Sequence, residues 1–448
     1  MAKTNTSVIA TPVFTHEGAK AQSVGPYAEL CRTLMTCLLW EDTFYESGDS
    51  VAARIAELVP KVEPEKIAAL AVEARSKMQL RHAPLFLVRE LARRKGTGPL
   101  VRDTLETVIQ RADELSEFVS LYWKDKRQPL SAGVKKGLAS AFQKFNAYRL
   151  AKYNRDSKVK LRDVLFLCHA KPKDAEQAAL WKSLINGTLQ PPDTWEVALS
   201  ASKDKKETWE RLLREGKLGG LAVLRNLRNM QQANVDGSLI KDRLSKGIAR
   251  ALPFRFVAAA RHAVSLEPEI EQAMFLSAKE LPMFPGRTAL LVDVSYSMDA
   301  ALSSKSDMNR IDAAAALAIL LREKAETALV GTFSNHFVEV PARRGFALRD
   351  AIAQSQPHSG TATGAAIQVA CAKWKFDRLI VITDEQSQDA IPAMVNTAAY
   401  MVNVAPYKHG ISYGNGWQHI DGWSERILDY IRAVEEKDLT SAAEVEED

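Results

Sequence analysis

The feature that most constrains the fold is a change in hydrophobic pattern near Pro285-Gly286. From Pro26 to about residue 280, apolar residues recur at helical spacing, and short breakers separate the runs. Examples of these breakers are Gly48-Asp49, Gly96-Thr97-Gly98-Pro99 and Gly133. After Pro285, strand-like apolar runs alternate with helical runs. This order predicts an all-α part followed by an α/β part with a parallel sheet covered on both faces.

The pattern also predicts where the elements and domains lie. Predicted strands of the α/β part are Thr288–Val294, Leu329–Phe333, Leu379–Thr383 and Tyr400–Val404, and predicted helices span 311–324, 348–353, 364–374 and 424–434. The predicted domains are an extended arm (1–25), a helical domain (26–284), an α/β domain (285–434) and an acidic tail (435–448). The helical part shows no strict repeat period, so irregular helix pairs of the HEAT type suit it better than a regular solenoid.

Composition excludes several classes of protein. The four cysteines, Cys31, Cys37, Cys168 and Cys371, have neither C-x-x-C pairing nor histidines at zinc-like spacing, which argues against a disulfide framework or a zinc knot. No apolar run of about 18 residues occurs, and no apolar segment follows Lys3. We therefore expect a soluble cytoplasmic protein with reduced thiols and no membrane partner.

Oxygen-bearing side chains stand at the ends of two predicted strands. Asp293 ends an apolar run and is followed by Ser295 and Ser297, while Asp384 follows the run Leu379–Thr383. Thr361 lies in a Gly-Thr-Ala-Thr-Gly segment that precedes the intervening helix. Open α/β sheets bind ligands beyond their strands' carboxyl ends, and an all-oxygen set suits Mg²⁺ better than Zn²⁺. Individually, such residues also serve as helix caps or turn residues.

The stretch from Lys124 to Asp174 is strongly basic. It carries 14 Lys and Arg residues against four Asp, an excess of ten charges, whereas the whole chain has a net charge of only +5. Interleaved with it are Tyr122, Trp123, Phe145, Tyr148, Tyr153 and His169. Cations for phosphates together with aromatic planes for unstacked bases are typical of proteins that bind single-stranded or looped RNA. A solvated charged face with its aromatic residues in the core remains the alternative.

Several segments resemble known families. The Asp293-Val294-Ser295-Tyr296-Ser297 motif, with Thr361 and Asp384, resembles the metal-ion-dependent adhesion site (MIDAS) of von Willebrand factor A (vWA) domains. Six segments are similar to the TROVE domain of Ro autoantigens and their bacterial relatives: Thr15–Ala19, Cys37–Tyr45, Lys152–Asp156, Leu161–Pro172, Ala222–Met230 and Leu252–Phe254. The two resemblances together cover nearly the whole chain, in the family's domain order.

The resemblance implies a monomeric ring of HEAT-like helical repeats closed by a vWA domain. Such a ring binds Y RNAs on its outer basic surface and admits single-stranded ends of defective RNAs to its central hole. In bacterial relatives, the RNA is presented to an exoribonuclease, polynucleotide phosphorylase. The implied MIDAS binds its ion partly through water and leaves a position for an acidic residue of a partner, although some family members have lost the ion.

The resemblance also implies roles for particular residues. Lys152 and His169 match positions of the family's RNA-contacting surface, whereas Asp156 stands where the family usually has a basic residue, with Arg155 one place earlier. Lys135, Lys136 and Arg149 are candidates by charge alone. Arg225 and Asn226 match a block whose role is either helix packing or RNA contact.

Two functions of different classes follow. The first is a non-enzymatic RNA-binding scaffold of the Ro type. The second is a protein-interaction module in which the MIDAS binds an acidic partner residue. A nuclease or helicase lacks support, because the sequence has neither a P-loop nor a clustered acidic catalytic set.

Overall fold

The computed structural model describes most of the chain, in two compact units. The described residues are 14–21, 25–36, 47–154, 156–192, 194–248, 251, 253–279, 281, 283–302, 307–405, 407, 409–411, 414–422, 427–428, 430–432 and 434–435. One unit, called here the helical unit, comprises residues 33–42 and 47–280. The other, the α/β unit, comprises residues 1–32, 43–46 and 281–448.

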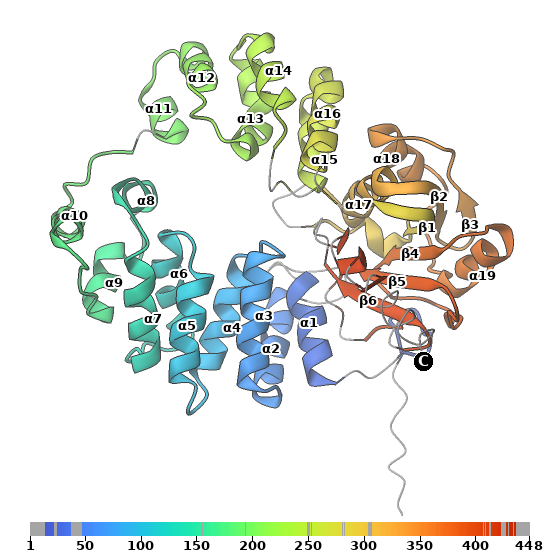
Figure 1. The fold of residues 1–448 in the computed structure, drawn as a ribbon, viewed down its shortest axis with the longest axis horizontal. Helices are drawn as coiled ribbons and strands as arrows, with labels where there is room; N and C mark the ends of the chain where they lie inside the picture. Colours follow the sequence, from blue (N-terminus) through green and yellow to red (C-terminus); the bar gives the residue numbers. More distant parts are fainter. Residues whose placement is uncertain are drawn as a thin grey trace, which may run out of the picture. The chain divides into compact units, whose positions relative to one another are not determined.

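Residues 47–279, as far as they are described, form helices and no strand, which confirms the all-α prediction. The helices, preceded by α1 (Pro26–Thr36), are α2 (Gly48–Leu58), η1 (Val59–Lys61), α3 (Pro64–Ser76), α4 (His82–Ala92), α5 (Gly98–Val108), α6 (Asp113–Tyr122), α7 (Ala132–Phe142), α8 (Ala147–Tyr153), α9 (Leu161–Cys168), α10 (Ala175–Asn186), α11 (Trp195–Ala201), α12 (Lys205–Arg214), α13 (Gly220–Gln232), α14 (Gly237–Ser245), α15 (Pro253–His262), η2 (Val264–Leu266) and α16 (Glu267–Ser277) (Figure 1).

These helices pack mainly on neighbours in the sequence, as in a helical-repeat array. α3 packs on α4 and α5, α5 on α7, and α7 on α9; farther along, α13 packs on α15 and α14 on α16. Gly133 is not the breaker predicted from the sequence, because it lies within α7. A Cβ atom there would lie 2.4 Å from the carbonyl oxygen of Gly98, so glycine allows α7 to approach α5 closely.

The α/β unit contains a six-stranded sheet in the order β3-β2-β1-β4-β5-β6. The strands are β1 (Phe284–Asp293), β2 (Ala325–Phe333), β3 (Phe337–Glu339), β4 (Arg378–Thr383), β5 (Ala398–Asn403) and β6 (Trp417–Asp421), with η3 (Tyr296–Asp299), α17 (Arg310–Lys324), α18 (Gly345–Ala353) and α19 (Thr363–Lys373) between them. The sequence pattern missed β3 and β6, which are short edge strands. It was also wrong to predict a purely parallel sheet, because β3 runs antiparallel to β2.

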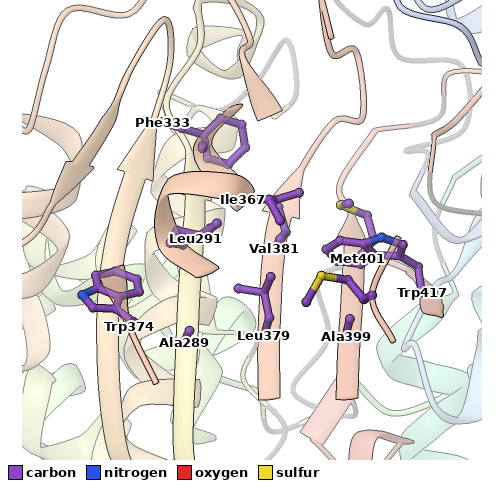
Figure 2. Packing of buried hydrophobic residues seen from close by; sticks show 13 residues of the cluster. Ala289, Leu291, Phe333, Ile367, Trp374, Leu379, Val381, Ala399, Met401 and Trp417 are labelled. Carbon is purple, nitrogen blue, oxygen red and sulfur yellow. The ribbon is translucent and has the colours of Figure 1, made fainter. Parts of the chain in front are cut away.

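The core of this unit explains why its strands read as continuous apolar runs. On one face of the sheet, Leu291, Val381 and Met401 belong to a buried cluster to which the helix α19 contributes Ile367 (Figure 2). The alternating residues Leu290, Val292, Ile380 and Ile382 are also fully buried, and α17 packs on β1 and β2. A strand buried on both faces has no polar alternation.

Part of the predicted N-terminal arm has a defined fold. Residues 14–21 form a turn with a bridge between Phe14 and Lys20. Thr15 Oγ1 donates to the carbonyl oxygen of Ser387 at 2.5 Å, and the backbone N–H of His16 donates to Gln386 Oε1 at 2.8 Å. This segment is therefore bound to the loop after β4. Residues 1–13 of the arm, most of the predicted acidic tail (436–448) and parts of the predicted 424–434 helix lie outside the described residues.

Candidate functional site

The predicted metal ligands meet at the carboxyl edge of the sheet, where the strand order reverses. β1 pairs in parallel with both β2 and β4, so the chain leaves β1 toward one side of the sheet and returns on the other. Asp293 is the last residue of β1, and Asp384 immediately follows β4. This is the switch point at which open α/β sheets bind ligands.

Asp293 is fully buried and held by hydrogen bonds. Its Oδ1 accepts from the backbone N–H of Ser295 at 2.8 Å, and its Oδ2 accepts from the Thr383 hydroxyl at 2.5 Å. The Ser295 and Ser297 hydroxyls lie 3.3 Å apart. Burial, and secondarily the nearby carboxylate of Asp384, raises the pKa of Asp293 to about 7. A divalent cation bound here would compensate the negative charges of these two buried carboxyl groups.

Asp384 has a cationic neighbour that the sequence analysis missed. Arg310, at the start of α17, is buried, and its Nη1 lies 3.5 Å from Asp384 Oδ2. The other carboxylate oxygen of Asp384 accepts from the backbone N–H of Gln386 at 3.2 Å. No motif drew attention to Arg310, because it lies 74 residues away from Asp384 in the sequence.

Thr361 belongs to a loop that is tied to both other parts of the centre. The N–H of Tyr296 donates to the carbonyl oxygen of Ser359 at 2.9 Å, and that of Gln388 donates to Thr361 O at 2.9 Å. Thr361 itself is 2% exposed. The buried hydroxyl of Thr363, another residue that the sequence analysis passed over, has no hydrogen-bond partner among the described residues. We give the name metal centre to the candidate site formed by Asp293, Ser295, Ser297, Thr361 and Asp384.

The donor set of the metal centre fits a hard divalent cation. All five side chains offer oxygen, and all are buried. In the described part of the chain, no cluster of three or more His, Cys, Asp or Glu residues could hold a metal ion. The five oxygen-bearing side chains thus match the ligand chemistry of Mg²⁺ better than that of Zn²⁺.

Lys152 and His169 lie at the ends of two consecutive helices of the helical unit. Lys152 is half-buried near the end of α8, with its Nζ 5.9 Å from the ring centroid of Tyr148 and 5.8 Å from that of Tyr153. His169 follows α9 in the left-handed conformation, with φ of 53°, and is exposed. An ammonium group beside aromatic rings and an exposed imidazole can contact phosphates and bases.

The other predicted cations stand near this pair in the sequence. Lys136 on α7 and Arg149 on α8 are exposed, and Lys135 is half-buried. Arg155 lies outside the described residues. Asp156, which occupies the family's basic position, pairs with Lys160 at 2.8 Å, and that hydrogen bond lowers its pKa. At this position the chain therefore has a carboxylate that pairs with Lys160 in place of the family's basic side chain. We define the basic surface as Lys135, Lys136, Arg149, Lys152, Arg155 and His169.

Some aromatic residues of the basic stretch lie in the core, as the structural alternative predicts, whereas others are partly exposed, as an RNA-binding surface requires. Tyr122 and Phe145 are core residues, 5% and 2% exposed, as the structural alternative predicts. The stem of Lys144 is exposed, but its Nζ donates to the carbonyl oxygens of Glu106 and Ile109, the latter at 2.6 Å. Partial burial of this ammonium group lowers its pKa. Trp123, Tyr148 and Tyr153 keep part of their surface exposed.

Comparison with protein families assigns the helical unit. The TROVE domain model matches residues 28–188 and 180–275, more than half of the chain. The chain belongs to the TROVE family. A second model, the Ro60 vWA domain, matches residues 287–397, so this TROVE protein has the Ro type of domain order. The chain is therefore a protein of the Ro type.

Individual relatives support the fold of this TROVE protein. The crystal structure of the Deinococcus radiodurans Ro (RSR) protein superposes with a TM-score of 0.59 at 16% identity, covering 91% of this chain and 100% of that one. Telomerase protein component 1 is 36% identical over 121 residues in Mus musculus and over 110 in Rattus norvegicus, 25% and 23% of this chain. The matches span only 4% of those proteins. Among the described helices, none has the length and apolarity needed to span a bilayer.

The TROVE block Ala222–Met230 lies within α13. Arg225 is exposed, whereas Asn226 is 7% exposed. Asn226 Nδ2 donates to Ala222 O at 2.8 Å, and Asn226 Oδ1 accepts from Asn229 Nδ2 at 3.0 Å. Both bonds lie within α13, and it is the burial of Asn226 that favours the packing role, whereas Arg225 is exposed and available for contact.

Proposed function

We propose that this Ro-type protein is a non-enzymatic scaffold that binds a small, Y-like noncoding RNA through the basic surface. On this proposal the protein is a cytoplasmic monomeric ring whose central hole receives single-stranded ends of structured or misfolded RNA. It presents that RNA to an exoribonuclease such as polynucleotide phosphorylase. The observation that carries the proposal is the placement of Lys152 and His169 at the C-terminal ends of the consecutive helices α8 and α9, with Arg149 and Lys136 exposed nearby in the sequence.

The chemistry of these side chains suits RNA better than a protein partner. Lysine and arginine side chains release counterions from phosphates, and an exposed imidazole offers both a stacking plane and a hydrogen bond. The side chains are borne by the helices α7 and α8 and by the residue that follows α9, which restricts their positions.

The proposal is tested by the double variant Lys152→Glu/His169→Ala in a filter-binding assay with co-purified RNA. We expect RNA binding to be at least about tenfold weaker. The slope of the logarithm of the binding constant against the logarithm of the salt concentration should fall in magnitude by about one. The matched control is Lys61→Glu, which reverses an exposed charge of the same unit outside the basic surface. Unchanged retention and unchanged salt dependence in the double variant would overturn RNA binding at this surface.

A second function is favoured by the paired buried carboxylates of the metal centre. We propose that Asp293, Ser295, Ser297, Thr361 and Asp384 hold Mg²⁺, some of them through water. The ion supplies a coordination position for an acidic residue of a partner protein. Calorimetric titration with Mg²⁺ tests this: absence of Mg²⁺ uptake by the natural protein would make the centre vestigial.

A further inference from the structure

The exposed face of α9 and the residue after it carry three side chains that suit a nucleotide. Arg162 and Phe166 are four residues apart, so they share one face of α9, and His169 directly follows the helix; all three are exposed. Leu161, Val164, Leu165 and Cys168 occupy the opposite, buried face. The Phe166 ring is 59% exposed. Phe166 is an aromatic residue of the basic stretch that the sequence pattern did not single out.

Phe166 lines a cavity of about 960 Å³ within the helical unit. Trp123 and Tyr153 line the same cavity, as do the cations Arg127 and Lys158. The Arg127 guanidinium lies 4.9 Å from the centroid of the Trp123 ring, whose Nε1 donates to the carbonyl oxygen of Gln128 at 2.7 Å. Lys158 forms no ion pair with any residue that the structure describes. The cavity therefore offers aromatic planes together with cations.

The acidic residues of the cavity wall are already paired. Arg81 Nη2 binds Asp113 at 2.7 Å and also binds Glu117. Asp163 accepts from the backbone N–H of Lys160 at 2.9 Å. Asp113 and Glu117 are paired with Arg81, and Asp163 Oδ1 lies 3.9 Å from Arg162 Nε, so Arg127 and Lys158 remain to attract a phosphate.

We propose that Phe166 stacks on an unpaired base of the bound RNA, while the adjoining phosphate lies against Arg127 and Lys158. This inference rests on the proposed function and extends it by naming the ligand as a bulged or looped nucleotide. A phenyl ring reads no base edge and requires only a free base plane, so the site selects unpaired over paired nucleotides rather than one base over another. A base within a continuous duplex has both faces covered by its neighbours.

The test uses two RNA hairpins that differ only in one unpaired 2-aminopurine, a base whose fluorescence falls on stacking. The natural protein should bind the bulged hairpin more tightly and quench its fluorescence. Phe166→Ala should weaken binding of the bulged hairpin by roughly 5- to 150-fold, the range of one base–aromatic stack, and abolish the quenching. Binding of the fully paired hairpin should not change, and Phe166→Trp should restore both signals.

Val264→Ala, which truncates an apolar side chain that is 70% exposed, is the control and should leave both hairpins unaffected. If Phe166→Ala binds both hairpins as the natural protein does, or loses both equally, the stacking assignment is overturned. The proposed function then still stands if Lys152→Glu/His169→Ala loses both hairpins. If the natural protein binds neither hairpin, the assignment and the proposed function both fail.

Discussion

The metal centre and the basic surface are built on opposite physical principles. The metal centre consists of buried oxygen ligands fixed by backbone and side-chain hydrogen bonds, among them the 2.8 Å bond from the N–H of Ser295 to Asp293. The described side chains of the basic surface are exposed or half-buried. Buried charges are poorly screened and cost free energy when uncompensated, whereas exposed charges are screened by salt.

This contrast predicts how each site should respond to substitutions and to salt concentration. In the metal centre a single substitution should remove the function, because few ligands share a fixed geometry. On the basic surface each cation should contribute a small and roughly additive part, and the total should depend on salt. Substitutions and salt titrations should therefore affect Mg²⁺ binding and RNA binding differently.

The largest effect is expected from Asp293→Asn, which keeps the side chain's shape but removes its charge. At a free Mg²⁺ concentration of 100 times its dissociation constant, the natural protein should gain about 2.7 kcal/mol of unfolding free energy. The variant should gain almost none of it. Denaturant unfolding with and without Mg²⁺ measures both values, and an equal gain in the two proteins would remove Asp293 from the metal centre.

The next effect concerns salt. If the five Lys and Arg residues of the basic surface each contact one phosphate, doubling the salt concentration should weaken RNA binding about tenfold, from a slope of about 0.7 per contact. Mg²⁺ binding at the buried centre should change far less. Titrations of both ligands across a salt series compare them, and equal salt slopes would contradict the distinction between the two sites.

A smaller gain is expected from Asp156→Lys. The substitution removes the partner of Lys160 and restores a positive charge at the family's basic position. We expect RNA binding to tighten about fivefold, with a steeper salt slope. Glu57→Lys, the same change of charge at an exposed residue of α2, is the control. An equal gain in RNA affinity in the control would show that the effect comes from net charge and not from position 156.

The smallest effect on RNA binding is expected from Lys144→Met, despite its place in the basic stretch. Its ammonium group is engaged by backbone carbonyl oxygens, so RNA affinity should not change. The free energy of unfolding should fall by about 1–3 kcal/mol, the usual cost of losing a hydrogen bond from a charged group. Binding and denaturant titrations separate the two quantities, and weaker RNA binding without loss of stability would place Lys144 on the basic surface.

Much of the fold was predictable because it depends on local pattern. Helical spacing before residue 280 and alternating strands and helices after Pro285 follow from side-chain periodicity, and both predictions are confirmed. The edge strands β3 and β6 were missed because a short strand leaves little periodic signal. The carboxyl-end placement of Asp293 and Asp384 was also predictable, since each follows a buried apolar run.

The residue types, their order and the kinds of domain that they build follow from the amino-acid sequence alone. Which side chains become neighbours depends on the tertiary fold. The register of β1 on β4 brings Asp293 to Thr383 across 90 residues, and the packing of α17 brings Arg310 to Asp384. The tertiary fold likewise brings the ammonium group of Lys144 to backbone carbonyl oxygens and leaves Phe166 exposed. Periodicity encodes which face of an element is buried, whereas the partner of a polar group depends on segments that meet only in the folded chain.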